Sequence, residues 1–360
     1  MILLGSTGSI GVNVLNIARE FNLEVETLVA GSNIKLLNTQ IKEFRPKFVA
    51  VAKKELIPYV KHDRVFYAEE GILEAINISK SKLVVNALVG FLGLVPTLEA
   101  LKLDKKLALA NKESLVVAGA FVDSSKIIPI DSEHFAVWYM LNDRTIKRII
   151  LTASGGPFRD MDISDIKNQK ASNALNHPNW KMGKKISIDS ATMTNKLFEL
   201  LEAKWLFDTD SVDAVIEKNS IIHALLEFKD GSTTAHFAGA DMRLPISYAL
   251  LGSEPSHKIV SNINLLDIKE LSFKKIEEKR YPIWQIKDEV LKNPQAGVVI
   301  NAANEIGVEA FLNGDISFFD ISKITLSSYK KFQDISLQNF NDIFEVDKEV
   351  RKFAKEMICY

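Results

Sequence analysis

At 360 residues the chain is long enough for two or three domains, and its apolar and charged fractions, 47% and 25%, are those of an ordinary soluble protein. The formal charge of -1, with no basic block, excludes the electrostatic footprint of a protein that binds nucleic acid or an anionic membrane surface. The one cysteine, Cys359, excludes an internal disulfide and a thiolate metal cluster, and it suits a cytoplasmic protein.

The first 130 residues alternate short β-rich runs with amphipathic stretches. The runs predicted to be strands are residues 2–4, 25–30, 48–51, 83–87, 107–110 and 127–130. This alternation is typical of an α/β fold with a Rossmann-type parallel sheet. Pro129 restricts the last strand, because proline is tolerated only at a strand end, an edge or a bulge.

A second region begins at Asp131 and is predicted to be an α+β domain. It contains a strand at 149–153 and a hairpin of 221–228 and 233–237, turned by Asp230 and Gly231. The chain after residue 281 is predicted to be helical, because its apolar residues recur at helical spacing. The predicted division is a nucleotide-binding domain (1–130), a catalytic domain (131–268), a linker (269–280) and a C-terminal helical domain (281–360).

A glycine-rich loop, Gly5 to Gly11 (GSTGSIG), follows the first strand and opens a helix that runs to about Glu20. Glycines let the backbone approach a pyrophosphate, which the N-H groups at the helix start then bind. This context favours nucleotide binding over a mere tight turn. The second strand ends in Ala30 to Lys35 (AGSNIK), which lacks the carboxylate typical of an NAD site and offers small donors and a lysine. NADP is therefore favoured, the alternative being an ordinary turn.

Two polar clusters follow strands of the predicted sheet. One is Asn111, Lys112 and Glu113, and the other runs from Asp131 to His134. If the backbone stays extended after Asp131, its carboxylate and that of Glu133 point to the same side, and a hard divalent cation such as Mg²⁺ or Mn²⁺ would relieve their repulsion. The alternative for this cluster is a helix N-cap with an acidic first turn.

The segment Lys184 to Glu199 (KKISIDSATMTNKLFE) is predicted to lead from a short strand around Ile186 into a helix. Helical spacing places Asn195, Lys196 and Glu199 on one face, where Glu199 would be a third oxygen ligand for the cation. The alternative is a solvated helix face that carries one ion pair.

Other loops offer groups for a phosphate and for a lid. Ser154 precedes two glycines after a strand, so its hydroxyl and the loop N-H groups could bind a phosphate. Residues 176–183 form a predicted lid that carries Trp180. The alternative is that Trp180 anchors this loop to the core. His223 and His236 lie in the predicted hairpin and are interpreted as structural.

These segments closely resemble the 1-deoxy-D-xylulose 5-phosphate reductoisomerase family, over essentially the whole chain and in the family's order. The resemblance rests on GSTGSIG at Gly5, NKES at Asn111, DSEH at Asp131, SGGPF at Ser154, HPNWKMG at His177, KISIDSATMTNK at Lys185, MRLPI at Met242 and NAANE at Asn301.

The resemblance implies a homodimeric enzyme of isoprenoid precursor biosynthesis. It would use NADPH and Mg²⁺ or Mn²⁺ to rearrange and reduce 1-deoxy-D-xylulose 5-phosphate to 2-C-methyl-D-erythritol 4-phosphate. Implied metal ligands are Asp131, Glu133 and Glu199, and Lys112 and His177 are further implied catalytic residues. The remaining implied substrate contacts are Ser132, Ser154, Trp180, Ser190, Asn195 and Lys196. The implied cofactor contacts are Thr7, Gly8, Ser9, Ile10, Gly31, Ser32, Asn33, Asn111, Glu113 and Gly183.

The sequence departs from the family pattern at three places. Ser32 stands where relatives commonly have a basic residue, Leu197 where many have glycine, and Glu217 to Asn219 replace a His-Pro-Gln run. None of these removes a proposed ligand. Two other hypotheses are an NADP-linked dehydrogenase that needs no carboxylate cluster, and a catalytically silent nucleotide sensor.

Overall fold

The computed structural model describes residues 1–180 and 182–358, which form two compact units. The first unit comprises Met1–Ser114, Val122–Ser132 and Asp241–Ser261. The second comprises Leu115–Phe121, Glu133–Ala240 and the chain from Asn262 onward. The predicted α/β fold class is confirmed: one sheet is fully parallel, a second is mixed, and the end of the described chain is helical.

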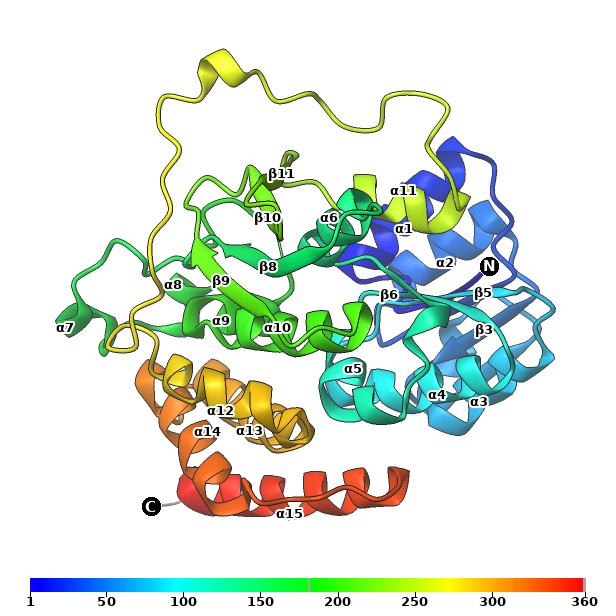
Figure 1. Cartoon of the computed structure of the whole chain (residues 1–360). Coiled ribbons are helices and arrows are strands. Elements are labelled where there is room, and N and C mark those ends of the chain that lie inside the picture. The colour runs from blue at the N-terminus through cyan, green and yellow to red at the C-terminus, as the bar shows by residue number, and fades with distance from the viewer. Residues whose placement is uncertain (181, 359–360) are drawn as a thin grey trace. The chain divides into compact units, whose positions relative to one another are not determined.

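A seven-stranded parallel sheet is the frame of the first unit (Figure 1). Its strand order is β4-β3-β2-β1-β5-β6-β7, so the chain runs outward from β1 in one direction and then in the other. The strands are β1 (Ile2–Leu4), β2 (Thr27–Ala30), β3 (Phe48–Val51), β4 (Val65–Tyr67), β5 (Leu83–Asn86), β6 (Lys106–Leu109) and β7 (Ile127–Pro129).

The central strands are apolar and buried on both faces, as helices on both sides of a parallel sheet require. All predicted strands of this region are present, with ends that differ by no more than two residues from prediction. Pro129 is the last residue of β7, which is an edge strand, so its missing N-H costs no sheet hydrogen bond. Strand β4 was not predicted, because it is a short edge strand that is only partly buried.

Helices follow the strands of this unit. They are α1 (Ser9–Glu20), α2 (Ile34–Phe44), α3 (Ala68–Ile78), α4 (Leu94–Lys102) and the start of α5 (Lys112–Ala118). A later helix, α11 (Arg243–Leu251), also belongs to this unit. Its buried residues Ile246 and Ala249 belong to the same hydrophobic core as Leu3, Val14 and Leu28. This packing holds residues 241–261 against the parallel sheet.

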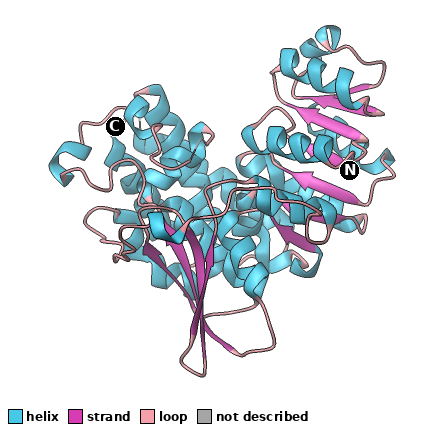
Figure 2. Cartoon of the chain, turned by 90° about the horizontal axis from the view of Figure 1, so that it is seen from above, coloured by secondary structure: helices cyan, strands magenta, loops and turns pink. Residues whose placement is uncertain are grey.

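A four-stranded mixed sheet with the order β11-β10-β8-β9 is the frame of the second unit. Its strands are β8 (Ile146–Ala153), β9 (Val212–Ile216), β10 (Ile222–Phe228) and β11 (Thr233–Phe237). The strands of each sheet lie side by side in Figure 2. The predicted hairpin is confirmed as β10 and β11, whereas β9 was not predicted.

The remaining α-helices lie wholly or mostly in the second unit. They are α6 (Ser132–Met140), α7 (Ile163–Ile166), α8 (Ala171–Ala174), α9 (Lys184–Thr192), α10 (Thr194–Phe207), α12 (Lys287–Lys292), α13 (Gly297–Asn313), α14 (Phe318–Phe332) and α15 (Phe340–Ile358). The last three pack against one another, as Figure 1 shows. The prediction that the chain after residue 281 is helical is therefore confirmed for the described residues.

The strand predicted around Ile186 is wrong, because Lys184 to Thr192 form helix α9. Ile188 and Ala191 pack with Phe158 and Phe311 in one hydrophobic cluster, so burial is satisfied at helical spacing. Central strand β8 already has a partner on each side, β9 and β10. A four-residue alternation is too short to separate strand from helix, and tertiary packing decides the outcome.

The backbone after Asp131 is not extended either, because α6 begins at Ser132. The alternative reading, a helix start with an acidic first turn, describes the local conformation, with Glu133 in that turn. The carboxylates nevertheless come together, as described below. A carboxylate before the helix and one in its first turn can therefore converge as well as two from an extended strand.

Candidate active site

The glycine-rich loop between β1 and α1 has the conformation that the sequence predicts. Gly5 has a φ of +84°, and a Cβ there would lie 2.5 Å from the Ala87 carbonyl oxygen, so no other residue fits without movement. The N-H groups of Gly5 and Ser6 both donate to the Val29 carbonyl, at 2.9 and 2.8 Å. Helix α1 starts at Ser9 after Gly8, and no side chain caps it in this fully described segment. Backbone N-H groups of the first turn are thus placed as in an anion site.

Small polar residues stand at the end of β2. Gly31, Ser32, Asn33 and Lys35 are all exposed, and the Asn33 side chain accepts the Leu36 N-H at 3.2 Å as the N-cap of α2. This segment therefore combines a helix N-terminus, a hydroxyl and an ammonium group. That set of donors is suited to a phosphate and contains no carboxylate to repel one.

Asn111 and Glu113, which the family resemblance implies to be cofactor contacts, belong to a buried hydrogen-bond network. The Asn111 amide donates to the carbonyls of Leu88 and Gly90, at 3.0 and 2.9 Å, and to Glu113 at 3.1 Å. Its oxygen accepts the backbone N-H of Ser114 at 3.2 Å. The side chain of Asn111 thus fixes the loop after β5 to the start of α5, and its role as a cofactor contact stays a prediction.

Three carboxylates converge. Asp131 follows β7, Glu133 is in the first turn of α6, and Glu199 is on α10. Each offers one oxygen, and these oxygens all lie within 4.8 Å of one another. Oxygen ligands at this separation fit a hard divalent cation such as Mg²⁺.

Cationic and amide side chains surround these carboxylates. Lys112 Nζ lies 2.9 Å from an Asp131 oxygen. Lys196 Nζ donates to Glu199 and lies 3.9 Å from a Glu133 oxygen, and Asn195 Nδ2 donates to the other Glu199 oxygen at 2.5 Å. The ion pair that the sequence offers as an alternative is therefore present, but it is buried instead of solvated. Buried charges need such partners to offset the cost of desolvation.

The backbone explains how these groups reach one site. Met193 has a φ of +70° and separates α9 from α10, so the chain turns between Ser190 and Asn195. His134 Nε2 donates to the Glu199 carbonyl at 2.9 Å and links α6 to α10. The two helices that carry Glu133 and Glu199 are thereby held together.

Ser154 and His177 meet directly. His177 Nδ1 accepts the backbone N-H groups of Asn179 and Trp180, at 3.2 and 3.0 Å, so the hydrogen of a neutral ring is on Nε2. That Nε2 lies 2.8 Å from Ser154 Oγ, which also accepts the Gly156 N-H at 3.1 Å. Burial, and then the Arg159 charge, lower the pKa of His177 to about 4, although Glu133 opposes this. The ring is therefore neutral at physiological pH.

The predicted lid, residues 176–183, includes Lys181, which lies outside the described residues, as does Cys359 near the chain end. Trp180 is half-buried, and its ring centroid lies 6.0 Å from that of His223. Gly183 precedes α9, and its carbonyl accepts the Ser187 N-H and hydroxyl. Ser190 lies beside the loop that follows Ser154, because a Cβ at Gly156 would be 3.0 Å from the Ser190 carbonyl oxygen.

His223, which the sequence places in the hairpin, lies close to the carboxylate triad. It is buried on β10, its Nδ1 lies 3.6 Å from a Glu133 oxygen, and its Nε2 contacts the Ala238 carbonyl at 3.2 Å. No local pattern could have indicated this, since 90 residues separate His223 from Glu133. His236 packs edge-on against Phe135, and burial with the nearby His223 lowers its pKa to about 4, which agrees with a structural role.

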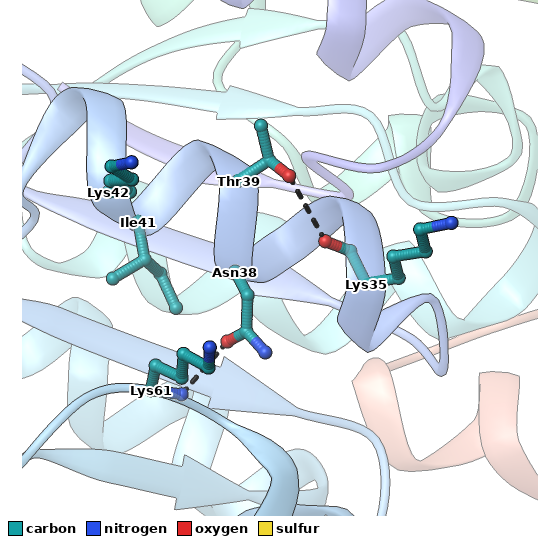
Figure 3. A pocket seen from close by; sticks show the side chains of 6 residues that line it. All are labelled: Lys35, Asn38, Thr39, Ile41, Lys42 and Lys61. Atoms are coloured by element: carbon teal, nitrogen blue, oxygen red, sulfur yellow. Dashed lines mark hydrogen bonds between the residues drawn. The ribbon is translucent and has the colours of Figure 1, made fainter.

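A hollow of about 680 Å³ is lined by residues of α2 and by Lys61 of the loop that packs on it (Figure 3). Asn38 ties α2 to the following loop, because it accepts the Lys61 N-H at 2.8 Å and donates to the Tyr59 carbonyl at 2.9 Å. The hollow is lined by Lys35, Asn38, Thr39, Ile41, Lys42 and Lys61. Long surface lysines of this kind are normally solvated.

The fold and the site together define a class of protein. It is an α/β protein that has both a glycine-rich loop of the kind that binds dinucleotides and three carboxylates that could hold a divalent cation. Family models agree with this class along the chain. Residues 1–119 match the model of 1-deoxy-D-xylulose 5-phosphate reductoisomerase, 127–207 that of its C-terminal domain, and 237–353 that of the DXP reductoisomerase C-terminal domain.

Full-length relatives make the assignment specific. The chain is 54% identical to the 1-deoxy-D-xylulose 5-phosphate reductoisomerase of Nautilia profundicola (99% of each chain) and 52% identical to that of Wolinella succinogenes (99% of this chain, 100% of the relative). This chain belongs to the 1-deoxy-D-xylulose 5-phosphate reductoisomerase family, and it is an enzyme.

Solved structures agree. A crystal structure of DOX-P reductoisomerase in complex with NADPH, fosmidomycin and magnesium matches with a TM-score of 0.94 at 34% identity, over 99% of this chain and 97% of that one. The Zymomonas mobilis enzyme in complex with NADPH matches with a TM-score of 0.88 at 32% identity, over 99% and 98%. Among the described residues, no helix is long and apolar enough to cross a membrane.

Proposed function

We propose that this enzyme uses NADPH and a divalent cation, Mg²⁺ or Mn²⁺, to rearrange and reduce 1-deoxy-D-xylulose 5-phosphate to 2-C-methyl-D-erythritol 4-phosphate. The observation that carries the proposal is the carboxylate triad in a chain whose solved relatives hold NADPH and magnesium. A simple dehydrogenase would need the glycine loop but not three converging carboxylates.

Asp131, Glu133 and Glu199 would hold the cation. When bound, a hard cation polarises a ketone and its neighbouring hydroxyl, and NADPH supplies hydride. Lys112 Nζ, 2.9 Å from an Asp131 oxygen, would hold that carboxylate in its orientation. Asn195 and Lys196 hold Glu199 from the other side, so the oxygen positions are fixed before any ligand arrives.

Phosphate binding falls to groups on two neighbouring segments. Ser154 and the N-H groups of the following glycine loop supply one side, and Ser190, Asn195 and Lys196 supply the other. Because His177 Nε2-H and the Gly156 N-H both donate to Ser154 Oγ, the Ser154 hydroxyl hydrogen can donate to a phosphate oxygen. Binding a phosphate remote from the reacting carbons holds those carbons in register.

The docked lid would exclude water. His177, Trp180 and Gly183 span it, and the hydrogen bonds of His177 to its own loop and to Ser154 hold it in place. Ser132, at the start of α6, and Lys112 would reach the substrate beside the metal ligands. A neutral His177 can donate through Nε2, so it orients a hydroxyl without adding a charge.

Cofactor binding is assigned to the glycine loop and the end of β2. The residues proposed to contact NADPH are Thr7, Gly8, Ser9, Ile10, Gly31, Ser32, Asn33, Asn111, Glu113 and Gly183. The exposed Lys35 and the lack of a carboxylate support NADPH over NADH. Manganese as an alternative metal, a homodimer, a cytoplasmic location and the domain boundaries at residues 130, 268 and 280 are further parts of this proposal.

A spectrophotometric assay tests the function. Purified enzyme should oxidise NADPH only when 1-deoxy-D-xylulose 5-phosphate and Mg²⁺ or Mn²⁺ are present, and a chelator should stop turnover until metal is restored. NADPH oxidation that is indifferent to the chelator would remove the metal from the proposal. Cofactor binding without turnover under every metal condition would favour a nucleotide sensor.

A further inference from the structure

A buried glutamine on α2 contacts the glycine-rich loop. Gln40 is 5% exposed, and its Nε2 donates to the carbonyl oxygen of Ser6 at 2.8 Å. A carbonyl can only accept, which fixes the orientation of the Gln40 amide. None of the cofactor contacts assigned above includes Gln40, yet it holds the peptide group that directly precedes Thr7.

Ser6 is held through both of its backbone groups, which belong to two successive peptides. The N-H of Ser6 donates to the Val29 carbonyl on β2 at 2.8 Å, and its carbonyl accepts from Gln40 on α2. The preceding Gly5 has a φ of +84° and no room for a Cβ, so the backbone enters the loop in a conformation that only glycine adopts here without strain. Rotation of the Ser6–Thr7 peptide would redirect the N-H of Thr7 and those that follow it. These are the N-H groups that the loop offers to a pyrophosphate.

The position of Gln40 on its helix matters as well. Asn33 caps the start of α2, and Gln40 follows seven residues later, which is two turns along nearly the same face. One helix therefore touches both the segment assigned to the 2′-phosphate and the loop assigned to the pyrophosphate. A rigid element that fixes two parts of one ligand site lowers the ordering cost of binding.

The burial of Gln40 indicates that its amide contributes through the hydrogen bond to Ser6. Gln40 Oε1 and Ser6 Oγ are buried, and neither has a hydrogen-bond partner among the described residues. An unpaired buried acceptor is unfavourable, and an apolar side chain of the same size would fill the space without that cost. The donor bond to Ser6 is thus the contribution that an apolar residue could not make.

We propose that Gln40 is a positioning residue for NADPH: it fixes the Ser6 carbonyl and so aims the N-H groups from Thr7 onward at the cofactor pyrophosphate. This inference rests on the proposed use of NADPH and adds a residue that acts through the loop. It predicts that loss of Gln40 weakens cofactor binding and leaves substrate binding unchanged. Gln40 and the loop lie in the first unit, whereas Glu199, Lys196 and Ser154 lie in the second.

Two substitutions test this in the full-length enzyme. Gln40→Met keeps the length and removes the donor, and Gln40→Glu keeps the shape but puts an acceptor against a carbonyl. Thr39→Ala is the matched control on the same helix: Thr39 is exposed, and its hydroxyl donates to the Lys35 carbonyl at 3.3 Å (Figure 3). For each variant we would measure the Kd of NADPH by fluorescence without substrate, KM for both substrates, kcat and the melting temperature.

We expect both Gln40 variants to raise the Kd and the KM of NADPH about tenfold, the scale of one net hydrogen bond with its unpaired partner. We expect kcat and the KM of the sugar phosphate to stay within about twofold, and the Thr39 control to match wild type throughout.

Wild-type affinity for NADPH in both folded Gln40 variants would overturn the inference. A fall in melting temperature with equal losses in all kinetic constants would also overturn it, since that is the pattern of a structural role. Wild-type enzyme that binds no NADPH would contradict the proposed cofactor itself and this inference with it.

Discussion

Replacing Glu199 by glutamine removes one charge from the carboxylate triad while keeping the side-chain shape. Glu199 is 1% exposed, and its oxygens contact Lys196 and Asn195. A unit charge about 4 Å from another contributes roughly 4 kcal/mol at an effective dielectric constant of about 20. Part of this is offset, because a cation must compete with Lys196 for Glu199. We therefore expect a net loss of about 3 kcal/mol, or roughly 100-fold in cation affinity.

Calorimetric titration of Mn²⁺ into the wild type and Glu199→Gln measures this loss directly, and fluorescence titration reports NADPH binding separately. The control is Glu202→Gln: Glu202 is on the same helix and 3% exposed, but it pairs with His134 and is not in the triad. Glu199→Gln should abolish turnover and spare NADPH binding, whereas the control should keep its Mn²⁺ affinity. Equal Mn²⁺ affinity in Glu199→Gln and wild type would refute the ligand role.

Three further predictions concern the substrate, the lid and the cofactor. Lys196→Ala should raise the KM of the sugar phosphate at least about tenfold, as expected for loss of a charge-assisted contact, and an unchanged KM in steady-state kinetics would count against phosphate binding. The pKa of His177, lowered to about 4, lies below its usual value of about 6.5, so lid docking should be complete above that usual value and should weaken as the pH falls from there toward 4. An NMR titration that shows His177 charged at pH 6 would contradict this. Ser32→Lys should lower the KM of NADPH by up to about fivefold and leave that of NADH unchanged, because an exposed ion pair contributes at most about 1 kcal/mol; equal effects on both cofactors would argue against a 2′-phosphate contact.

The parallel sheet was predictable because its strands carry a strong local signal. Runs such as Phe48–Val51 are continuously apolar and buried on both faces, and turn-forming residues bound them. The signal fails for Val65–Tyr67, which is short and only partly buried at the sheet edge. It also misleads at Lys184–Thr192, where two isoleucines two apart are compatible with a strand, and only the packing of Ile188 against distant residues makes the segment helical.

The candidate site also has a part that the sequence predicts and a part that it does not. Asp131, Glu133 and Glu199 could be grouped from the sequence because each lies in a dense polar motif whose chemistry indicates a metal. The conformation after Asp131 could not be fixed, since an acidic helix start and an extended strand end look alike there. The contacts of His223 with Glu133 and of Gln40 with Ser6 could not be predicted, because each joins residues far apart in the sequence.

In the proposed function, one metal-dependent site both rearranges the carbon skeleton and supports its reduction by NADPH. NMR analysis of the product from ¹³C-labelled 1-deoxy-D-xylulose 5-phosphate and deuterium-labelled NADPH tests it most directly. We predict a branched product, 2-C-methyl-D-erythritol 4-phosphate, that carries one deuterium and forms only with Mg²⁺ or Mn²⁺. A linear deuterated sugar alcohol, formed with or without metal, would contradict the claim and identify a simple dehydrogenase.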